Sequence, residues 1–210
     1  MKLHVAVHIV VALCLSFGTG CTGIENYYPI HSLSVPSEIV GRSAPESSPS
    51  VSVAFEFQTN GNLNRAVTSK YRQHVIRIIE QSKLFTSVQS KLFSSVSDRQ
   101  SNAQAVMRIA MNNVYDSLAG AVAAGFISGI TLGLIGSSVT DNYVFEARYQ
   151  SQDKEPFVQN YTAAVTSTSG LIVLGVDGVN PMRTPGEAVT EILERVIKTW
   201  LLDIQRGGHL

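Results

Sequence analysis

Hydrophobic and polar residues alternate over residues 51–58, which predicts a β-strand with one buried face. The turn at residues 60–62, Asn-Gly-Asn, ends this strand and offers a helix cap. Apolar residues then recur at helical spacing over residues 63–79, and Arg72 and Arg77 fall on the other face of that helix. The pattern therefore predicts a strand followed by an amphipathic helix.

The middle of the chain predicts four more strands. Residues 82–88 end the helix and begin the second strand. Alternating hydrophobic residues predict strands over residues 105–111, 143–149 and 157–165. The polar turn at residues 151–156 joins the last two of these strands.

The strongest helix signal lies near the C-terminus. Residues 184–187, Thr-Pro-Gly-Glu, form a capping box with proline at the first helical position. An apolar stripe runs over residues 189–204, and the glycines at 207–208 end the helix. The order of elements predicts an α+β domain over residues 50–206. We expect a mostly antiparallel sheet of about five strands with two amphipathic helices on one face.

A Gly-rich apolar insert interrupts this pattern. Residues 117–140 form a run of 24 residues without a charged side chain. Gly125, Gly129 and Gly133 are spaced four apart, which places small residues on one face of a helix where another helix can approach. Three hypotheses remain open for this insert: contact with a membrane, self-association, and burial between two strands.

The flanks of the insert weaken the membrane hypothesis. The run is long enough to span a bilayer. However, it lies between Asp116 and Asp141 and has no adjacent Lys, Arg or Trp as an interfacial anchor. A second apolar run, residues 170–176, is too short to span as a helix, and could pack beside the first run or enter the same surface.

Residues 1–20 predict a secretory signal peptide. Lys2 precedes a short apolar stretch that ends at Phe17, and small residues follow. A buried N-terminal helix is the alternative interpretation. Removal of the signal peptide takes away Cys14, so the exported chain keeps a single cysteine, Cys21.

The segment ending at Cys21 resembles a bacterial lipobox. Its sequence is Phe-Gly-Thr-Gly-Cys over residues 17–21, with Gly18 where leucine is usual. The resemblance implies that Cys21 becomes the first residue of the mature chain and carries three acyl chains, enough for stable anchoring. The residue after the cysteine is Thr22 and not Asp, which resembles lipoproteins of the outer membrane that face the periplasm. A secreted protein with a spare thiol is the alternative.

Residues 21–49 contain four of the seven prolines and no sustained periodicity. This composition predicts a flexible tether after the lipidated cysteine, with an average span of roughly 30 Å. An irregular arm packed on the domain is the alternative for residues 24–40.

Charge and motifs restrict the function further. Lys+Arg and Asp+Glu are 16 each, the net charge is zero and only 15% of residues are charged, which disfavours nucleic-acid binding. The sequence has no CxxC, HExxH, GxSxG or phosphate-loop motif, and His31, His74 and His209 are scattered. We therefore expect no catalytic residues, no metal site and no cofactor.

Several features together resemble a group of bacterial envelope lipoproteins. They are the single cysteine after a signal peptide, "KLFTSV" at a helix end, "SGITLGLIG" before "DNYVFEARY", and the amphipathic last helix. The small domains of that group look like the α/β modules of the Tol-system N-terminal domain, the penicillin-binding-protein activator lipoproteins and the curli secretion lipoprotein. The resemblance covers residues 50–206 and implies a binding or assembly module.

These observations predict a lipid-anchored, non-enzymatic lipoprotein that binds envelope proteins and is able to form a homo-oligomer. The alternative is a membrane-inserting oligomeric protein that uses residues 117–140. The partner and the pathway do not follow from the sequence.

Overall fold

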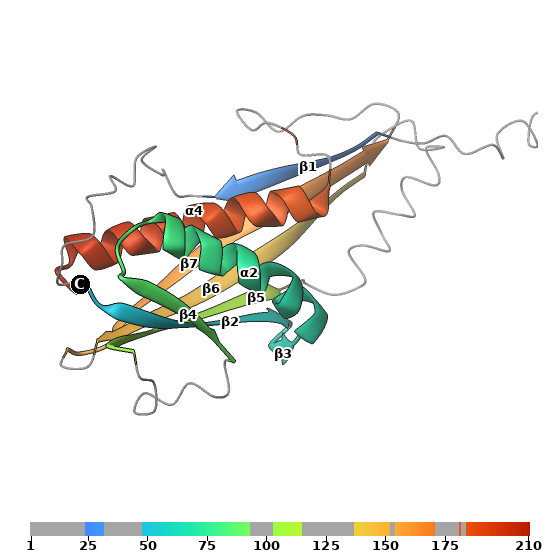
Figure 1. Ribbon diagram of the computed structural model, residues 1–210. Coiled ribbons are helices and arrows are strands. Elements are labelled where there is room, and N and C mark those ends of the chain that lie inside the picture. Colours follow the sequence, from blue (N-terminus) through green and yellow to red (C-terminus); the bar gives the residue numbers. More distant parts are fainter. Residues whose placement is uncertain are drawn as a thin grey trace, which may run out of the picture.

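The computed structural model describes residues 24–31, 48–92, 103–114, 137–151, 154–170, 181 and 184–210. The predictions for the signal peptide and Cys21, and for Gly125, Gly129 and Gly133, lie outside these residues. The described part is one seven-stranded sheet with two helices (Figure 1). Its elements are β1 (Ile24–His31), β2 (Ser50–Thr59), β3 (Asn62–Leu63), α2 (Arg65–Gln81), β4 (Ser87–Lys91), β5 (Ala105–Val114), β6 (Ser137–Ser151), β7 (Phe157–Gly170) and α4 (Pro185–Arg206).

The sheet is mixed and mostly antiparallel, which confirms the predicted α+β class. The strand order is β1-β7-β6-β5-β2-β3, and β4 pairs with β2 beside β3. Strand β2 is parallel to β4 and β5, and all other pairs are antiparallel. The sheet has seven strands where the sequence predicted about five, because β1 and the two-residue strand β3 were not anticipated.

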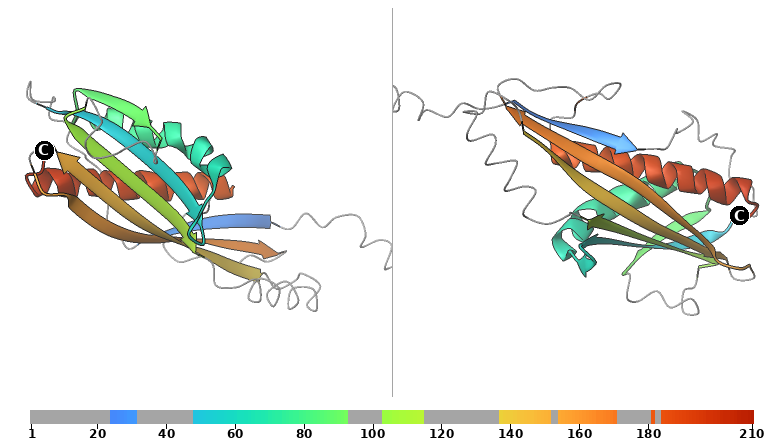
Figure 2. Two further views of the ribbon diagram at one scale, coloured as in Figure 1. Left: turned by 90° about the horizontal axis from the view of Figure 1, so that it is seen from below. Right: turned by 180° about the vertical axis from the view of Figure 1, so that it is seen from behind.

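Both helices pack on the same face of the sheet. Helix α2 packs on β2 and on α4, and α4 packs on β1 and β7. The view from behind in Figure 2 shows the sheet in front of α4, and no described helix covers this second face. The core lies between the sheet and the helices, and its largest fully buried side chains are Trp200, Tyr149, Phe55 and Phe145.

Helix α4 begins and ends as its sequence predicts. The Thr184 hydroxyl accepts a hydrogen bond from the Glu187 backbone N–H at 3.1 Å, and the Glu187 carboxylate accepts one from the Thr184 N–H at 3.3 Å. This capping box satisfies N–H groups that the helix itself cannot pair. Gly207 is the C-cap, and the predicted apolar stripe is buried along the helix.

Helix α2 begins one turn later than the predicted cap. Its N-cap is Asn64, whose side chain accepts a hydrogen bond from the Val67 N–H at 3.2 Å. The residues expected to supply the cap instead form the turn between β2 and β3. Asn60 and Gly61 have positive φ angles of 48° and 78°, a conformation that asparagine and glycine tolerate best.

The prediction of a flexible tether over residues 21–49 is wrong for residues 24–31. These residues form β1, which pairs with β7 over its whole length at the edge of the sheet. The sequence pattern did not predict this strand because it contains Pro29, a residue that argues against a central strand. Proline is tolerated in an edge strand, where one side of the backbone does not need to donate a hydrogen bond within the sheet. Tyr28 of β1 is only 3% exposed, so the strand is part of the folded domain.

The Gly-rich insert is also shorter than predicted. Residues 137–140, its last four, are the first residues of β6 and pair with residues 166–169 of β7. Their Ser and Thr side chains did not alternate with apolar ones, so the strand pattern was recognisable only from Tyr143 onward.

Candidate functional site

The edge of the sheet at β2 contains a gap. Strand β4 pairs with residues 50–54 of β2, and β3 pairs with residues 58–59. Among the described residues, no strand lies beside residues 55–57 on this edge. The start of α2 fills part of the gap, because the Thr68 hydroxyl accepts a hydrogen bond from the Phe57 N–H at 2.9 Å and the Asn64 N–H donates to the Phe57 carbonyl at 2.8 Å.

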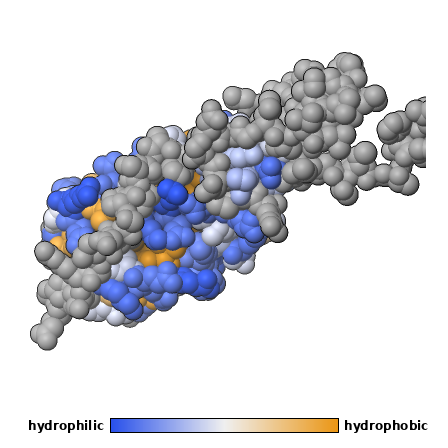
Figure 3. All heavy atoms as spheres, turned by 90° about the horizontal axis from the view of Figure 1, so that it is seen from above, coloured by the Kyte–Doolittle hydropathy of each residue, from blue (hydrophilic) through white to orange (hydrophobic). Residues whose placement is uncertain are grey.

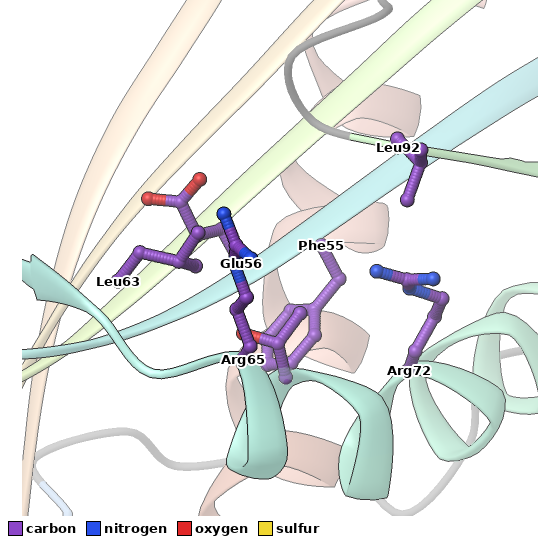
Figure 4. A pocket seen from close by; sticks show the side chains of 7 residues that line it. Phe55, Glu56, Leu63, Arg65, Arg72 and Leu92 are labelled. Atoms are coloured by element: carbon purple, nitrogen blue, oxygen red, sulfur yellow. The ribbon is translucent and has the colours of Figure 1, made fainter.

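A pocket of about 340 Å³ occupies the rest of this gap (Figure 4). Arg65 and Arg72 reach it from two positions of α2 that are two turns apart, and Glu56 reaches it from β2. The remaining lining residues are Phe55, Leu63, Thr68 and Leu92. The two guanidinium groups outnumber the one carboxylate, Glu56, so the pocket can hold a partly apolar ligand that carries an acidic group.

Sequence analysis did not identify this pocket. Helical spacing assigned Arg72 to the face of α2 that points away from the core, and that assignment left no reason to connect it with Glu56. Arg65 and Arg72 are seven residues apart, which is two helical turns, so they share one side of the helix. That spacing was the available signal, but the gap in the sheet edge is visible only in the structure.

The seven lining residues include one carboxylate, Glu56, and one hydroxyl, Thr68, and none of the seven is a Cys, His, Ser or Lys. Among the described residues, no three His, Cys, Asp or Glu side chains are close enough to hold a metal ion. His74 lies on another part of α2, where burial lowers its pKa, the charge of Glu194 opposes this shift and that of Arg77 adds to it.

A second feature is the end of the sheet formed by residues 24–28, 137–141 and 165–170, which we name the hydroxyl-rich end. Strands β1, β6 and β7 reach it, and β6 and β7 extend there beyond the helices (Figures 1 and 2). Its side chains are mainly Ser, Thr and Tyr, and the Thr140 and Thr166 hydroxyls are hydrogen-bonded at 2.9 Å. Burial raises the pKa of the Asp141 carboxyl, one of its two acidic groups.

The opposite end of the sheet carries charged residues and contacts the C-terminal residues of the chain. The Lys154 ammonium donates hydrogen bonds to the Gly208 and Leu210 carbonyls at 2.9 and 3.0 Å. The rings of Phe157 and His209 lie 4.4 Å apart. The two ends of the same sheet therefore present different chemistry.

The described residues on the face seen from above are mainly hydrophilic, with small, separate hydrophobic patches (Figure 3). In the part of the chain that the structure describes, neither helix has the length and apolarity needed to cross a membrane.

No protein-family model and no curated protein matches this chain. The chain is distantly similar in structure to a neuraminyllactose-binding hemagglutinin homologue from Helicobacter pylori, with a TM-score of 0.37 and 12% identity over 83% of this chain and 91% of that one. It is also similar to a PelC variant dodecamer from Paraburkholderia phytofirmans, with a TM-score of 0.36 and 12% identity over 84% and 96% of the two chains. A second PelC dodecamer from the same organism gives a TM-score of 0.36 and 11% identity over 82% and 94%.

Proposed function

We propose that this chain is a bacterial envelope lipoprotein, anchored through acylated Cys21, whose α+β domain binds or organises other envelope components without catalysis. Thr22 after the cysteine favours the outer membrane, with the domain in the periplasm. The observation that carries the proposal is the place of β1. Only two residues separate Cys21 from Ile24, the first residue of a strand that is paired within the sheet.

The position of β1 makes the anchor short. Three residue steps from Cys21 to Ile24 span at most about 11 Å when the chain is fully extended. The longer flexible tether expected from composition would have allowed the domain to move well away from the bilayer. A lipid on Cys21 would instead hold the sheet directly against the membrane, as suits a protein that assembles partners at that surface.

The pocket beside α2 is the binding surface that we assign to a partner. It combines apolar contact with Arg65 and Arg72, the residue type that recognises carboxylates best. Apolar side chains and two arginines dominate its lining, which supports a binding role over an enzymatic one.

Metabolic labelling with a palmitate analogue tests the anchor. We expect label on the wild type and on Cys14→Ser, because Cys14 lies in the predicted signal peptide, and none on Cys21→Ser. An unlabelled wild type would overturn the proposal.

The alternative function is membrane insertion by oligomers through the Gly-rich insert. It is favoured by the 20 consecutive uncharged residues that remain in that run once residues 137–140 are assigned to β6. An alkaline wash of membranes distinguishes the two functions. Release of Cys21→Ser would show that the lipid is the only anchor, and its retention would favour insertion.

A further inference from the structure

Three parts of the chain join the sheet at the hydroxyl-rich end. Ile24, the first residue of β1, pairs with Gly170, the last residue of β7. Ser137, the first residue of β6, pairs with Ser169. Neighbouring strands are about 4.8 Å apart, so these three chain positions lie side by side within about 10 Å.

The sequence next to each position is either the lipidation motif or strongly apolar. Cys21 precedes Ile24 by three residues. The uncharged run over residues 117–136 leads directly into Ser137, and the apolar run over residues 171–176 follows Gly170. The two most apolar runs outside the core and the signal peptide therefore meet the folded domain where the lipidation motif meets it.

The described side chains at this end suit the interface of a bilayer. Tyr27, which is half-buried, is of the residue type that concentrates at headgroup depth, where the ring is apolar and the hydroxyl is wet, whereas Tyr28 is buried within the domain. Residues 165–170 contain five hydroxyl or glycine residues and no charge. At the opposite end of the sheet, Lys154, Glu155 and Arg206 would resist contact with lipid, and the hydroxyl-rich end has fewer charged residues, Glu25 and Asp141.

We infer that the hydroxyl-rich end of the sheet faces the lipid bilayer, so that β6 and β7 rise from the membrane and carry the charged end away from it. The inference deepens the proposed function and rests on its anchor at Cys21. It adds an orientation, since an acylated residue beside β1 would also permit the domain to lie flat on the membrane.

Three exposed valines lie at different distances from the hydroxyl-rich end, so labels at these positions can report the orientation. Val139, Val144 and Val158 are 37%, 41% and 45% exposed. Val158 pairs with Arg148, so the three valines lie at the levels of residues 139, 144 and 148 of β6. At about 3.4 Å per residue, the second and third levels are about 17 and 31 Å beyond the first.

Each valine is replaced by cysteine in the full chain, as Val139→Cys, Val144→Cys or Val158→Cys. Cys21 is the only cysteine expected in the mature chain, and acylation blocks its thiol, so the new thiol is the only one available to an environment-sensitive fluorophore. The labelled proteins are reconstituted in vesicles of phosphatidylethanolamine and phosphatidylglycerol that contain nitroxide-labelled lipid. We expect the emission to be quenched by more than half at Val139→Cys, less at Val144→Cys and not detectably at Val158→Cys.

Equal quenching at Val144→Cys and Val158→Cys would overturn the inference, because these two side chains lie on the same face of the sheet and would be at equal depth only in a domain that lies flat. Quenching that is strongest at Val158→Cys would overturn it as well. A blue shift at Val139→Cys that grows with protein concentration and occurs without lipid quenching would show that this end contacts a second copy, which also contradicts the inference.

A second arm separates this inference from the proposed function. The same three labels are placed in a Cys21→Ser chain without its signal peptide, at a protein concentration at which the unacylated chain binds the vesicles. Because this chain lacks both native cysteines, the introduced thiol is the only one that the fluorophore can label. A graded signal in this arm, together with no palmitate label in cells, would reject the lipoprotein proposal and keep the orientation. Palmitate label on Cys21 with an ungraded signal would keep the lipoprotein proposal and reject the orientation.

Discussion

The two halves of the β6–β7 hairpin have the same backbone pairing but different means of stabilisation. In the half next to the turn, Phe145 and Tyr161 face each other across the strands and contribute to the core under the helices. In the other half, Thr140 faces Thr166 and Val139 faces Ser167. The first half is stabilised by burial of large apolar side chains, and the second depends more on backbone and hydroxyl hydrogen bonds.

This difference shows that the two halves of one continuous hairpin contribute unequally to stability. Burial of apolar surface is the dominant favourable term in folding, so the half that carries it stabilises the domain most. The half with hydroxyl groups adds less to stability. Mutations in the two halves should therefore differ greatly in cost.

The largest difference is expected between Phe145→Ala and Val139→Ala. Phe145 is fully buried, and its truncation leaves a cavity, so we expect a loss of about 3–5 kcal/mol in the free energy of unfolding. Val139 is 37% exposed on the same strand, and we expect a change within about 0.5 kcal/mol. Urea unfolding followed by circular dichroism measures both. Similar losses would show that the two halves are equally packed.

Tyr161→Phe should have the next largest effect. The Tyr161 hydroxyl donates a 2.7 Å hydrogen bond to the Asp203 carboxylate of α4, and its loss should cost about 1–2 kcal/mol. Tyr149→Phe is the matched control, because the buried Tyr149 hydroxyl has no hydrogen-bond partner among the described residues. We expect Tyr149→Phe to cost little or to stabilise the domain, as measured by urea unfolding. An equal cost at both positions would rule out the special role of the bond to Asp203.

The same tyrosines predict a loss of stability at alkaline pH. Burial raises the pKa of Tyr149 from 10.0 to about 12. Burial, with the hydrogen bond to Asp203 and its charge, raises the pKa of Tyr161 further. A raised folded-state pKa gives stability that is complete below pH 10 and is lost as the pH rises toward the folded value, because only the unfolded chain ionises there.

We therefore expect the wild-type free energy of unfolding to fall between pH 10 and 12, and to fall less in Tyr149→Phe and in Tyr161→Phe. Urea titrations at a series of pH values measure the slope. Identical slopes in the wild type and in both variants would contradict the assignment.

Thr184→Ala tests the helix that covers the packed half. It removes the capping box of α4 and should cost about 1 kcal/mol. Asn64→Ala removes the single side-chain cap bond of α2, and we expect it to lower the free energy of unfolding somewhat less than Thr184→Ala does. Thermal unfolding of both variants measures the difference. The reverse order would show that the α2 cap, beside the pocket, matters more than the capping box.

Thr140→Val should have the smallest effect. It removes one hydroxyl of the Thr140–Thr166 pair but keeps the β-branched shape, so we expect a loss of a few tenths of a kcal/mol. Thr162→Val, at an exposed position in the packed half, is the control. A loss above about 1 kcal/mol in urea unfolding would show that hydroxyl pairing fixes the outer half more firmly than its side chains indicate.

Prediction from the sequence succeeded where local patterns and final structure agree. The box at residues 184–187 fixed the start of α4, and strict alternation located β2 and the packed half of β6. Strand β1 was not predicted because its partner, β7, lies far away in the sequence and its own pattern contains Pro29. A strand defined by a distant partner leaves little local signal.

The candidate pocket could not be predicted from the sequence for a similar reason. Arg72 and Glu56 belong to two elements, and the pocket between them exists because β3 and β4 each cover only part of one edge of β2. Strand lengths and edge gaps depend on three-dimensional packing, which periodicity does not encode. The predictions for Cys21 and for the glycines at 125, 129 and 133 stay predictions.

The pairing of β1 with β7 also determines when the domain can finish folding. The first strand of the chain joins a strand that is synthesised near its end, so the contact has one of the longest sequence separations in the domain. Until it forms, β7 exposes an unpaired edge that is prone to association with other strands. The described sheet is therefore complete only once β1 has paired with β7.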